Sequence, residues 1–188
     1  MFPRKGLTLI ELLVVMFLGG LILMVSLSFF TKNYKMIVRS SKEIDGAISS
    51  LNTIDLIISD LKKAGYGITD KKSYPPIFWD EENKTLTIKY VNYDKSDCEG
   101  VSFTSGDNCS YEIKYVFQNN NIKRTVDEGS DGSGTSAYLF DSKKLVVKDF
   151  TVNYDNKTKT VTFTLVVENK MSGKESNFID SVECLNCE

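Results

Sequence analysis

The sequence predicts an α+β fold, with a long N-terminal helix followed by an antiparallel β-sheet domain. Residues 7–30 are almost wholly apolar, and an amphipathic helical pattern continues to residue 64 without a proline. Beyond residue 67, short alternating runs separated by turn residues are typical of strands. The 188 residues leave room for one head domain beside the helix.

The apolar run is long enough to cross a membrane, because about 20 apolar residues in a helix span the ~30 Å hydrocarbon core. Its only polar side chains are those of Thr8, Glu11, Ser26 and Ser28. A cleaved secretory signal has a shorter apolar region, about 7 to 15 residues. Arg4 and Lys5 precede the run, and the positive-inside rule keeps them in the cytoplasm. We therefore expect a single-pass inner-membrane helix with an exported head.

The second half of the helix carries apolar residues at spacings of three and four. They are Tyr34, Ile37, Ile44, Ala47, Ile48, Leu51, Ile54, Ile58, Leu61 and Ala64. The stripe from Ile37 to Ala64 predicts a buried face that holds the sheet of the head, with subunit packing taking its N-terminal part. Gly65 and Gly67 supply a stop signal, so the helix is expected to be about 58 residues and roughly 85 Å long.

Six strands are predicted in the head, at residues 85–91, 111–117, 122–126, 145–154, 158–167 and 177–182. In the fifth, Val161, Phe163, Leu165 and Val167 form an inward face. Residues 119–121 and 155–157 are predicted turns, and residues 94–109 and 127–136 are predicted surface loops.

The four cysteines all lie in the predicted exported part, where thiols tend to be oxidised. Four cysteines allow three pairings. Local pairing of Cys98 with Cys109 and of Cys184 with Cys187 is favoured, while cross-pairing, a zinc site that uses all four cysteines and a redox pair at Cys184 and Cys187 remain alternatives.

One segment carries chemistry of its own: from Arg4 to Val15 the chain reads RKGLTLIELLVV. The Glu11 carboxylate is costly in lipid, by about 2.5 to 3.5 kcal/mol at a helix centre and less near an end. Cleavage between Gly6 and Leu7 would create an α-amine, and that amine on a neighbouring chain could neutralise Glu11.

This segment resembles the class III signal of type IV prepilins and type II secretion pseudopilins. The resemblance implies a pilin-like fold, and removal of the leader by a prepilin peptidase that methylates the new first residue, Leu7. Phenylalanine is usual at that position. The resemblance further implies four segments: a leader at 1–6, a transmembrane and polymerisation half of the helix at 7–30, an amphipathic half at 31–66 and a β head at 67–188. The expected partners are other pilins, a membrane platform protein and, before assembly, the bilayer.

A second segment, from Ile58 to Tyr66, resembles the D-x-R-x-A-G-Y pattern of PilW-type minor pilins and J-type pseudopilins, with Lys62 at the arginine position. The leading hypothesis is a minor pilin with an initiating or tip-associated role, and the alternative is a J-type pseudopilin. A hypothesis from another class is a membrane-anchored binding domain that is never processed.

Enzymatic functions find little support. The chain has no histidine, which excludes a Ser-His-Asp or Cys-His arrangement, and it has no G-x-S-x-G, Walker or G-x-G-x-x-G motif. We expect no cofactor and no metal; the loop at 127–131 only faintly resembles a calcium loop. A net charge of −2 gives no basic footprint, so no direct nucleic acid binding is expected.

Overall fold

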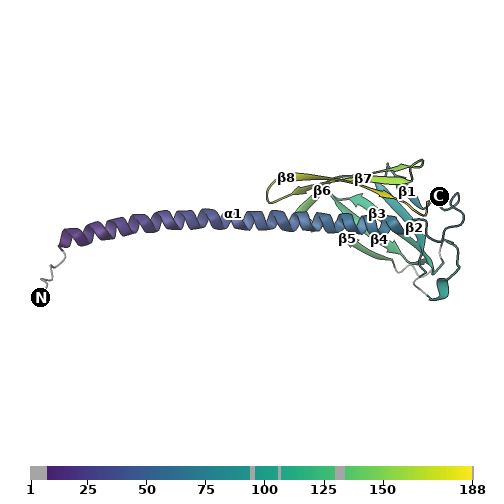
Figure 1. The fold of residues 1–188 in the computed structure, drawn as a ribbon, viewed down its shortest axis with the longest axis horizontal. Coiled ribbons are helices and arrows are strands. Elements are labelled where there is room, and N and C mark those ends of the chain that lie inside the picture. Colours follow the sequence, from purple (N-terminus) through teal and green to yellow (C-terminus); the bar gives the residue numbers. More distant parts are fainter. Residues whose placement is uncertain (1–7, 94–95, 106, 130–133, 188) are drawn as a thin grey trace. The chain divides into compact units, whose positions relative to one another are not determined.

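A computed structural model of the chain describes residues 8–93, 96–105, 107–129 and 134–187. By its contacts the chain divides into two units, residues 1–42 and residues 43–188. Helix α1 (Leu9–Lys63) begins in the first unit and ends in the second (Figure 1). The helix is therefore close to the predicted 7–64, with Leu7 itself outside the described residues.

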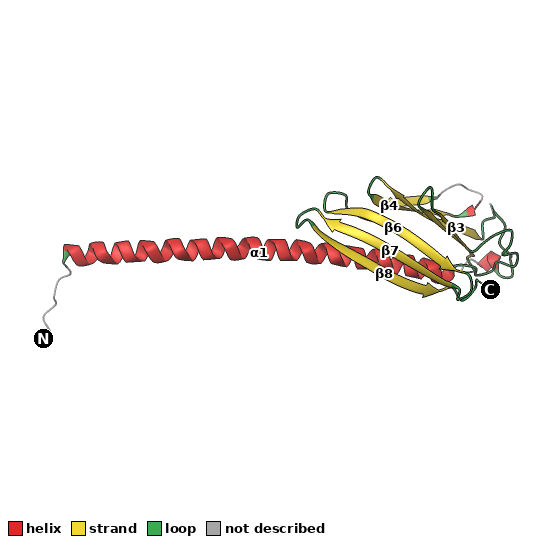
Figure 2. Ribbon diagram, turned by 90° about the horizontal axis from the view of Figure 1, so that it is seen from above, coloured by secondary structure: helices red, strands yellow, loops and turns green. Residues whose placement is uncertain are grey.

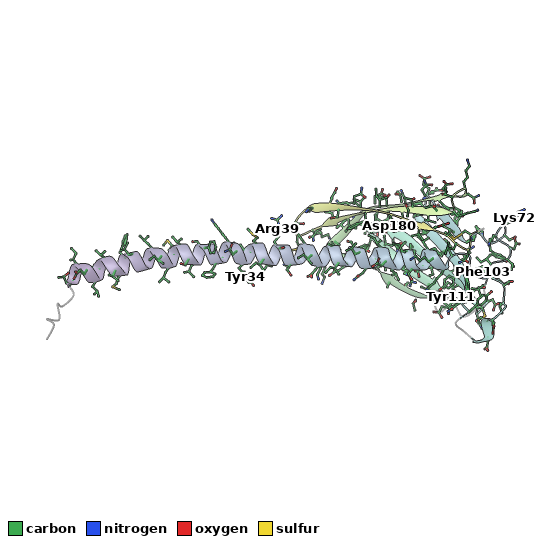
Figure 3. The ribbon with its side chains drawn as sticks, in the orientation of Figure 1. Tyr34, Arg39, Lys72, Phe103, Tyr111 and Asp180 are labelled. Carbon is green, nitrogen blue, oxygen red and sulfur yellow. A yellow bond between two sulfur atoms is a disulfide. The ribbon has the colours of Figure 1, made fainter. Side chains whose placement is uncertain are left out.

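The first unit, where the structure describes it, is the N-terminal part of α1. An apolar window of this helix is long enough to cross a membrane, and none of it is buried. Side chains such as Leu12, Phe17 and Ile22 are more than half exposed on different sides of the helix, and Figure 3 shows sticks all round it. A helix that is apolar on every side suits lipid or the packing of other apolar chains.

The second unit contains two antiparallel sheets in which neighbouring strands follow each other in sequence. The first sheet has five strands: β1 (Ile77–Asp80), β2 (Thr85–Val91), β3 (Ser110–Gln118), β4 (Asn121–Asp127) and β5 (Thr135–Tyr138). The second has three: β6 (Leu145–Asp155), β7 (Thr160–Asn169) and β8 (Lys174–Glu183). Figure 2 shows β6, β7 and β8 side by side as one curved layer.

All six predicted strands are confirmed, but two short strands were missed. Strand β1 has four residues and directly follows two prolines. Strand β5 reads TSAY and is exposed along its whole length, so it lacks the alternation that marks a half-buried strand. The predicted loops were correspondingly wrong at some positions: 127 ends β4, 135–136 begin β5, and a 3-10 helix, η1 (Ser96–Cys98), lies within 94–109.

The predicted turn after β3 is confirmed in detail. Asn119 and Asn120 have φ angles of 53° and 55°, and the flanking residues Gln118 and Asn121 pair across the two strands. Two consecutive left-handed residues make the tight hairpin turn whose twist matches that of the strands. Asparagine tolerates this conformation better than most residues do, which explains the sequence at this turn.

One hydrophobic core joins the end of the helix to both sheets. Its largest fully buried side chains come from α1 (Ile57, Leu61), the first sheet (Leu86, Ile88, Ile113, Tyr115, Ile122) and the second sheet (Val147, Phe150, Phe163, Leu165). Trp79 of β1 packs edge-on against Phe150 of β6, with ring centroids 5.7 Å apart. Each large apolar side chain buried here contributes about 1.5 to 3 kcal/mol.

Within the second unit, the head buries only the C-terminal part of the predicted stripe. Ile44, Ile48 and Leu51 are half or more exposed, whereas Gly46 and Ser50 are buried. The physical reason is close approach: a Cβ at position 46 would lie 2.9 Å from the side-chain amide nitrogen of Asn169 in β7 and 3.1 Å from a methyl group of Leu145 in β6. Only small residues fit where the strands come so near, so the bulky residues occupy another face.

The predicted stop of the helix is confirmed at Gly65. This residue has a φ of +78°, and its N–H donates to the carbonyl of Lys89 in β2 at 2.9 Å. A Cβ at this position would lie 2.1 Å from the carbonyl oxygen of Asn186. Glycine is needed here both for the left-handed backbone and for the close approach of the C-terminal segment.

Gly65→Ala should lower the free energy of unfolding of the head by about 2 to 5 kcal/mol, through left-handed strain and a backbone clash. Gly100→Ala is the matched control, because Gly100 has a φ of +76° with open space around the missing Cβ. Gly100→Ala should lower the free energy of unfolding only through the left-handed backbone strain, by about 1 to 2 kcal/mol. Thermal unfolding followed by near-UV circular dichroism compares the two, and equal losses would rule out the clash with Asn186.

Candidate functional site

The predicted processing residues Arg4, Lys5, Gly6 and Leu7 lie outside the described residues. The cleavage site between Gly6 and Leu7 and the methylation of Leu7 therefore stay predictions. The described chain begins at Thr8, which directly precedes the first residue of α1.

Thr8 and Glu11 cap the N-terminus of the helix. The backbone N–H and the hydroxyl of Thr8 both donate to Oε2 of Glu11, each at 2.8 Å. In return, the N–H of Glu11 donates to the hydroxyl oxygen of Thr8 at 3.4 Å. This reciprocal arrangement is a capping box, which satisfies backbone donors that have no partner in the first helical turn.

Sequence reasoning assigned Glu11 to docking but missed Thr8. The signal was present, because Thr-x-x-Glu before an apolar run is the pattern of a capping box. In the described residues the second carboxylate oxygen of Glu11, Oε1, has no hydrogen-bond partner. A carboxylate has about four acceptor positions, so capping leaves room for a further donor.

At the other end of α1, Asp60 is the centre of a buried polar network. Its side chain is only 2% exposed. Tyr115 of β3 donates its hydroxyl to Oδ2 of Asp60 at 2.5 Å, and Nε of Arg124 in β4 donates to the same oxygen at 2.8 Å. Tyr115 and Arg124 are register partners in the sheet. The network therefore ties the helix to two neighbouring strands at one point.

The charges in this network are balanced. Burial and the Asp60 carboxylate raise the pKa of Tyr115 well above its usual range, so the phenol stays a donor. Burial alone would lower the pKa of Arg124, but its hydrogen bond to Asp60 and the negative charge there outweigh burial and raise it. The buried carboxylate is thus paired with a cation and accepts two hydrogen bonds at Oδ2, and a buried charge needs such partners.

Sequence reasoning quoted Asp60 within the second motif but gave it no role. Its burial could have been expected, since Asp60 interrupts a helix face otherwise formed by Ile57, Leu61 and Ala64. A carboxylate on a buried face requires partners. Which strands supply them could not be read from the sequence.

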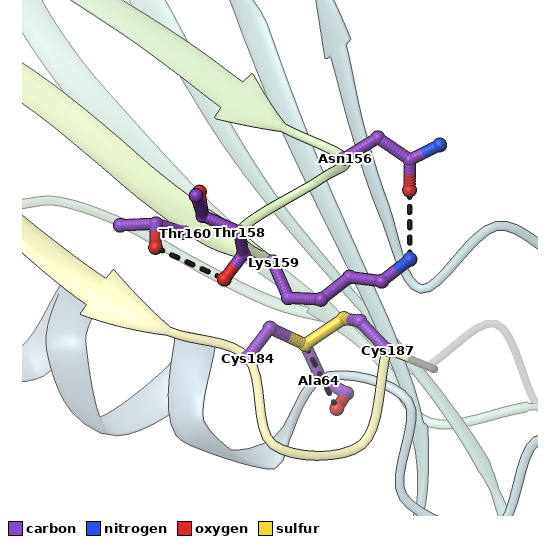
Figure 4. Close-up of a disulfide and its surroundings, with 7 residues drawn as sticks. All are labelled: Ala64, Asn156, Thr158, Lys159, Thr160, Cys184 and Cys187. Atoms are coloured by element: carbon purple, nitrogen blue, oxygen red, sulfur yellow. Dashed lines mark hydrogen bonds between the residues drawn. A yellow bond between two sulfur atoms is a disulfide. The ribbon is translucent and has the colours of Figure 1, made fainter.

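The remainder of the second motif forms the junction between α1 and the head. Ala64 is fully buried, and Sγ of Cys184 lies 3.6 Å from its carbonyl oxygen (Figure 4). Gly65 makes room for the C-terminal segment, as described above. Tyr66 is half exposed, and the centroid of its ring lies 5.0 Å from that of Tyr93.

The structure contains two disulfides, Cys98–Cys109 and Cys184–Cys187, which is the pairing that the sequence favoured. The first lies in a small core with Ile68, Val91 and Phe103. The second holds the C-terminal loop against the end of α1. Disulfide sulfurs are not zinc ligands, so the zinc alternative is wrong. No group of metal-ligating side chains forms among the described residues.

Comparisons with known proteins agree with this geometry. Residues 1–27 match the family model of the prokaryotic N-terminal methylation motif. The structure is similar to a type IV-like pilin from Thermus thermophilus, with a TM-score of 0.52 and 8% identity. The alignment covers 75% of this chain and 97% of that one. The fold is that of a type IV pilin-like protein. No curated protein matches the sequence.

The two likenesses complement each other in this pilin-like chain. The methylation motif covers Thr8 and Glu11 together with residues 1–6 and most of the apolar run. The structural match, at such low identity, concerns the fold alone. The chain thus combines an N-terminal methylation motif with a pilin-like fold.

Tyr115→Phe should lower the free energy of unfolding by about 1 to 3 kcal/mol at neutral pH, because Asp60 loses a buried donor. The pKa of Tyr115 is raised in the folded protein, so its stabilisation is complete below the unfolded pKa of about 10 and declines as the pH rises above it. The stabilities of wild type and variant should therefore converge in alkali.

Denaturant unfolding between neutral and alkaline pH measures this difference. Tyr138→Phe is the control, since Tyr138 is half exposed on β5, and it should be nearly neutral at every pH. A constant difference between wild type and Tyr115→Phe across the alkaline range would contradict the proposed role of burial.

Proposed function

We propose that this pilin-like chain is a minor subunit of a type IV pilus. It is inserted in the inner membrane, cleaved after Gly6, methylated at Leu7 and incorporated into a filament, where it initiates assembly or lies near the tip. The observation that carries the proposal is the methylation motif at residues 1–27 in a chain whose fold is pilin-like. The D-L-K-K-A-G-Y segment from Asp60 to Tyr66 supports the minor-pilin assignment.

The exposed apolar surface of α1 supports assembly through helix packing. In the first unit the described apolar side chains are exposed on all sides of the helix. In the second unit Ile44, Ile48 and Leu51 form a further exposed apolar face. Large exposed apolar surfaces mark membrane or protein contacts. We assign residues 7–30 to the bilayer and then to the filament core, and the Ile44 face to contacts between subunits.

Glu11 has two roles in this proposal. Through Oε2 it caps its own helix, and through Oε1 it accepts the methylated amine of Leu7 from the neighbouring subunit. Methylation keeps the charge of the amine, so the pair neutralises the carboxylate inside an apolar filament core. Such a pair contributes to register more than to net stability, because both charges are desolvated.

A J-type pseudopilin is the second candidate, and the same Asp60–Tyr66 segment supports it. The two candidates share processing, membrane insertion and helix packing, and they differ in the machine that they join. Copurification from the native host distinguishes them: a minor pilin is recovered with sheared pili, and a pseudopilin is recovered with the secretion complex.

Mass spectrometry of the protein from its native host should find a chain that begins at methylated Leu7. The mass should be lower than that of the full sequence by residues 1–6, with one methyl group added. A chain that retains Met1 would instead favour a membrane-anchored binding domain that never polymerises.

Glu11→Gln should leave insertion and cleavage intact and reduce incorporation into filaments by about tenfold or more, because an amide still accepts from Thr8 but cannot neutralise an amine. Thr8→Val should weaken only the cap, by about 1 kcal/mol, with a smaller effect on incorporation. Glu11→Val removes both functions. Quantitative immunoblots of sheared filaments provide the measurement, and normal filament levels with Glu11→Gln would refute the pairing.

A further inference from the structure

A pocket of about 490 Å³ opens beside the C-terminal end of α1, in the second unit. It lies within the volume range of about 300 to 1,000 Å³ that ligand sites occupy. Its described lining residues come from the end of the helix, from β2 and the turn after it, and from the C-terminal loop: Lys62, Lys63, Tyr66, Tyr90, Val91, Asn92, Tyr93 and Asn186.

Tyrosine rings form much of the wall of this pocket. The rings of Tyr66 and Tyr93 meet edge to face at 5.0 Å, and Tyr90 is backed by Tyr111 at 5.4 Å. Tyr93 is held in place because its hydroxyl donates to the carbonyl of Val101 at 2.9 Å. These contacts fix the rings before any ligand arrives, and preformed aromatic surfaces lower the entropic cost of binding.

The pocket also offers hydrogen-bonding groups. Within the described chain, the hydroxyls of Tyr66 and Tyr90 and the side-chain amide of Asn186 make no hydrogen bond. Burial raises the pKa of Tyr90 to about 12, so its hydroxyl is neutral and can donate. Asn186 is positioned by the tight contact of its backbone with Gly65 and by the neighbouring disulfide.

The charge at the rim is positive. Lys62 and Lys63 are exposed, and neither forms an ion pair with a residue that the structure describes. Nζ of Lys63 lies 5.8 Å from the centroid of the Tyr90 ring. No acidic side chain is among the described lining residues. Lys62 and Lys63 therefore place positive charge at the rim, which suits an anionic group there although the whole chain carries a net charge of −2.

We propose that this pocket binds a carboxylated sugar, a hexuronate unit of a glycan, with its ring on the tyrosines and its carboxylate on the lysines. Apolar sugar faces pack on aromatic rings, sugar hydroxyls exchange hydrogen bonds with phenols and amides, and ammonium groups pair with the carboxylate. A nucleic acid would need a basic groove that follows its backbone over several phosphates, and two lysines on an acidic protein do not provide one. The site would give the head a recognition function distinct from helix packing.

The test uses the full chain in detergent micelles, titrated with digalacturonate and followed by isothermal titration calorimetry. The methyl ester of the same disaccharide is the neutral control ligand. Wild type should bind digalacturonate saturably and at least about tenfold more tightly than the ester, since each charge-assisted contact is strong. The double variant Lys62→Gln and Lys63→Gln should lose about tenfold or more of the affinity.

Lys143→Gln with Lys144→Gln is the matched control, because these adjacent lysines are exposed between β5 and β6, and it should bind as wild type does. Tyr66→Ala, at a half-exposed position that tolerates substitution, should weaken binding about fivefold through lost ring contact.

Three results would overturn the proposal. They are no saturable binding of digalacturonate, equal losses in the two lysine-pair variants, and tighter binding of a short single-stranded oligothymidylate that depends on Lys62 and Lys63. The last result would assign the pocket to nucleic acid.

Discussion

The structure of the head depends on the last turns of α1 being part of its hydrophobic core. Ile57 and Leu61 are fully buried with residues of both sheets, and Asp60 between them accepts hydrogen bonds from Tyr115 and Arg124. Apolar burial supplies most of the stabilisation but is not directional. The buried Asp60 carboxylate fixes the orientation of the helix. Only one rotation about the helix axis and one position along it bring the carboxylate to its hydrogen-bond donors. The helix is thus fixed in register against the sheets.

The same helix meets an opposite requirement at its start, where no described chain covers it. There, polar groups must be satisfied locally, and the capping box of Thr8 and Glu11 does so within one turn. Because Oε1 of Glu11 is left over, one carboxylate can serve its own helix and a neighbouring subunit. Two acidic residues of the helix, Glu11 and Asp60, therefore meet the same electrostatic problem by different means: Glu11 by a local cap and the proposed amine of a neighbouring subunit, and Asp60 by partners within the head.

The candidate sites were predictable to different degrees. Glu11 and the residues before it stand out as charges beside an apolar run, and Thr8 could have been added from its spacing alone. The network around Asp60 was out of reach, because Tyr115 lies 55 residues away in sequence and Arg124 lies 64 away. The pocket with Tyr66, Tyr90 and Tyr93 was likewise hidden, because its lining joins the end of the helix, β2 and the C-terminal loop, which are far apart in the sequence.

The sequence by itself determined the elements: a helix without proline from the apolar run to Gly65, six of the eight strands that the structure describes, and the Asn119–Asn120 turn; it also favoured the local pairing of the cysteines. These follow from periodicity, backbone preference and short separation, which are properties of neighbouring residues. Only the tertiary structure decided which helix face is buried. Gly46 and Ser50 are covered, and Ile44 and Leu51 are exposed, because the distance between helix and strands selects side chains by size, and that distance depends on the whole fold.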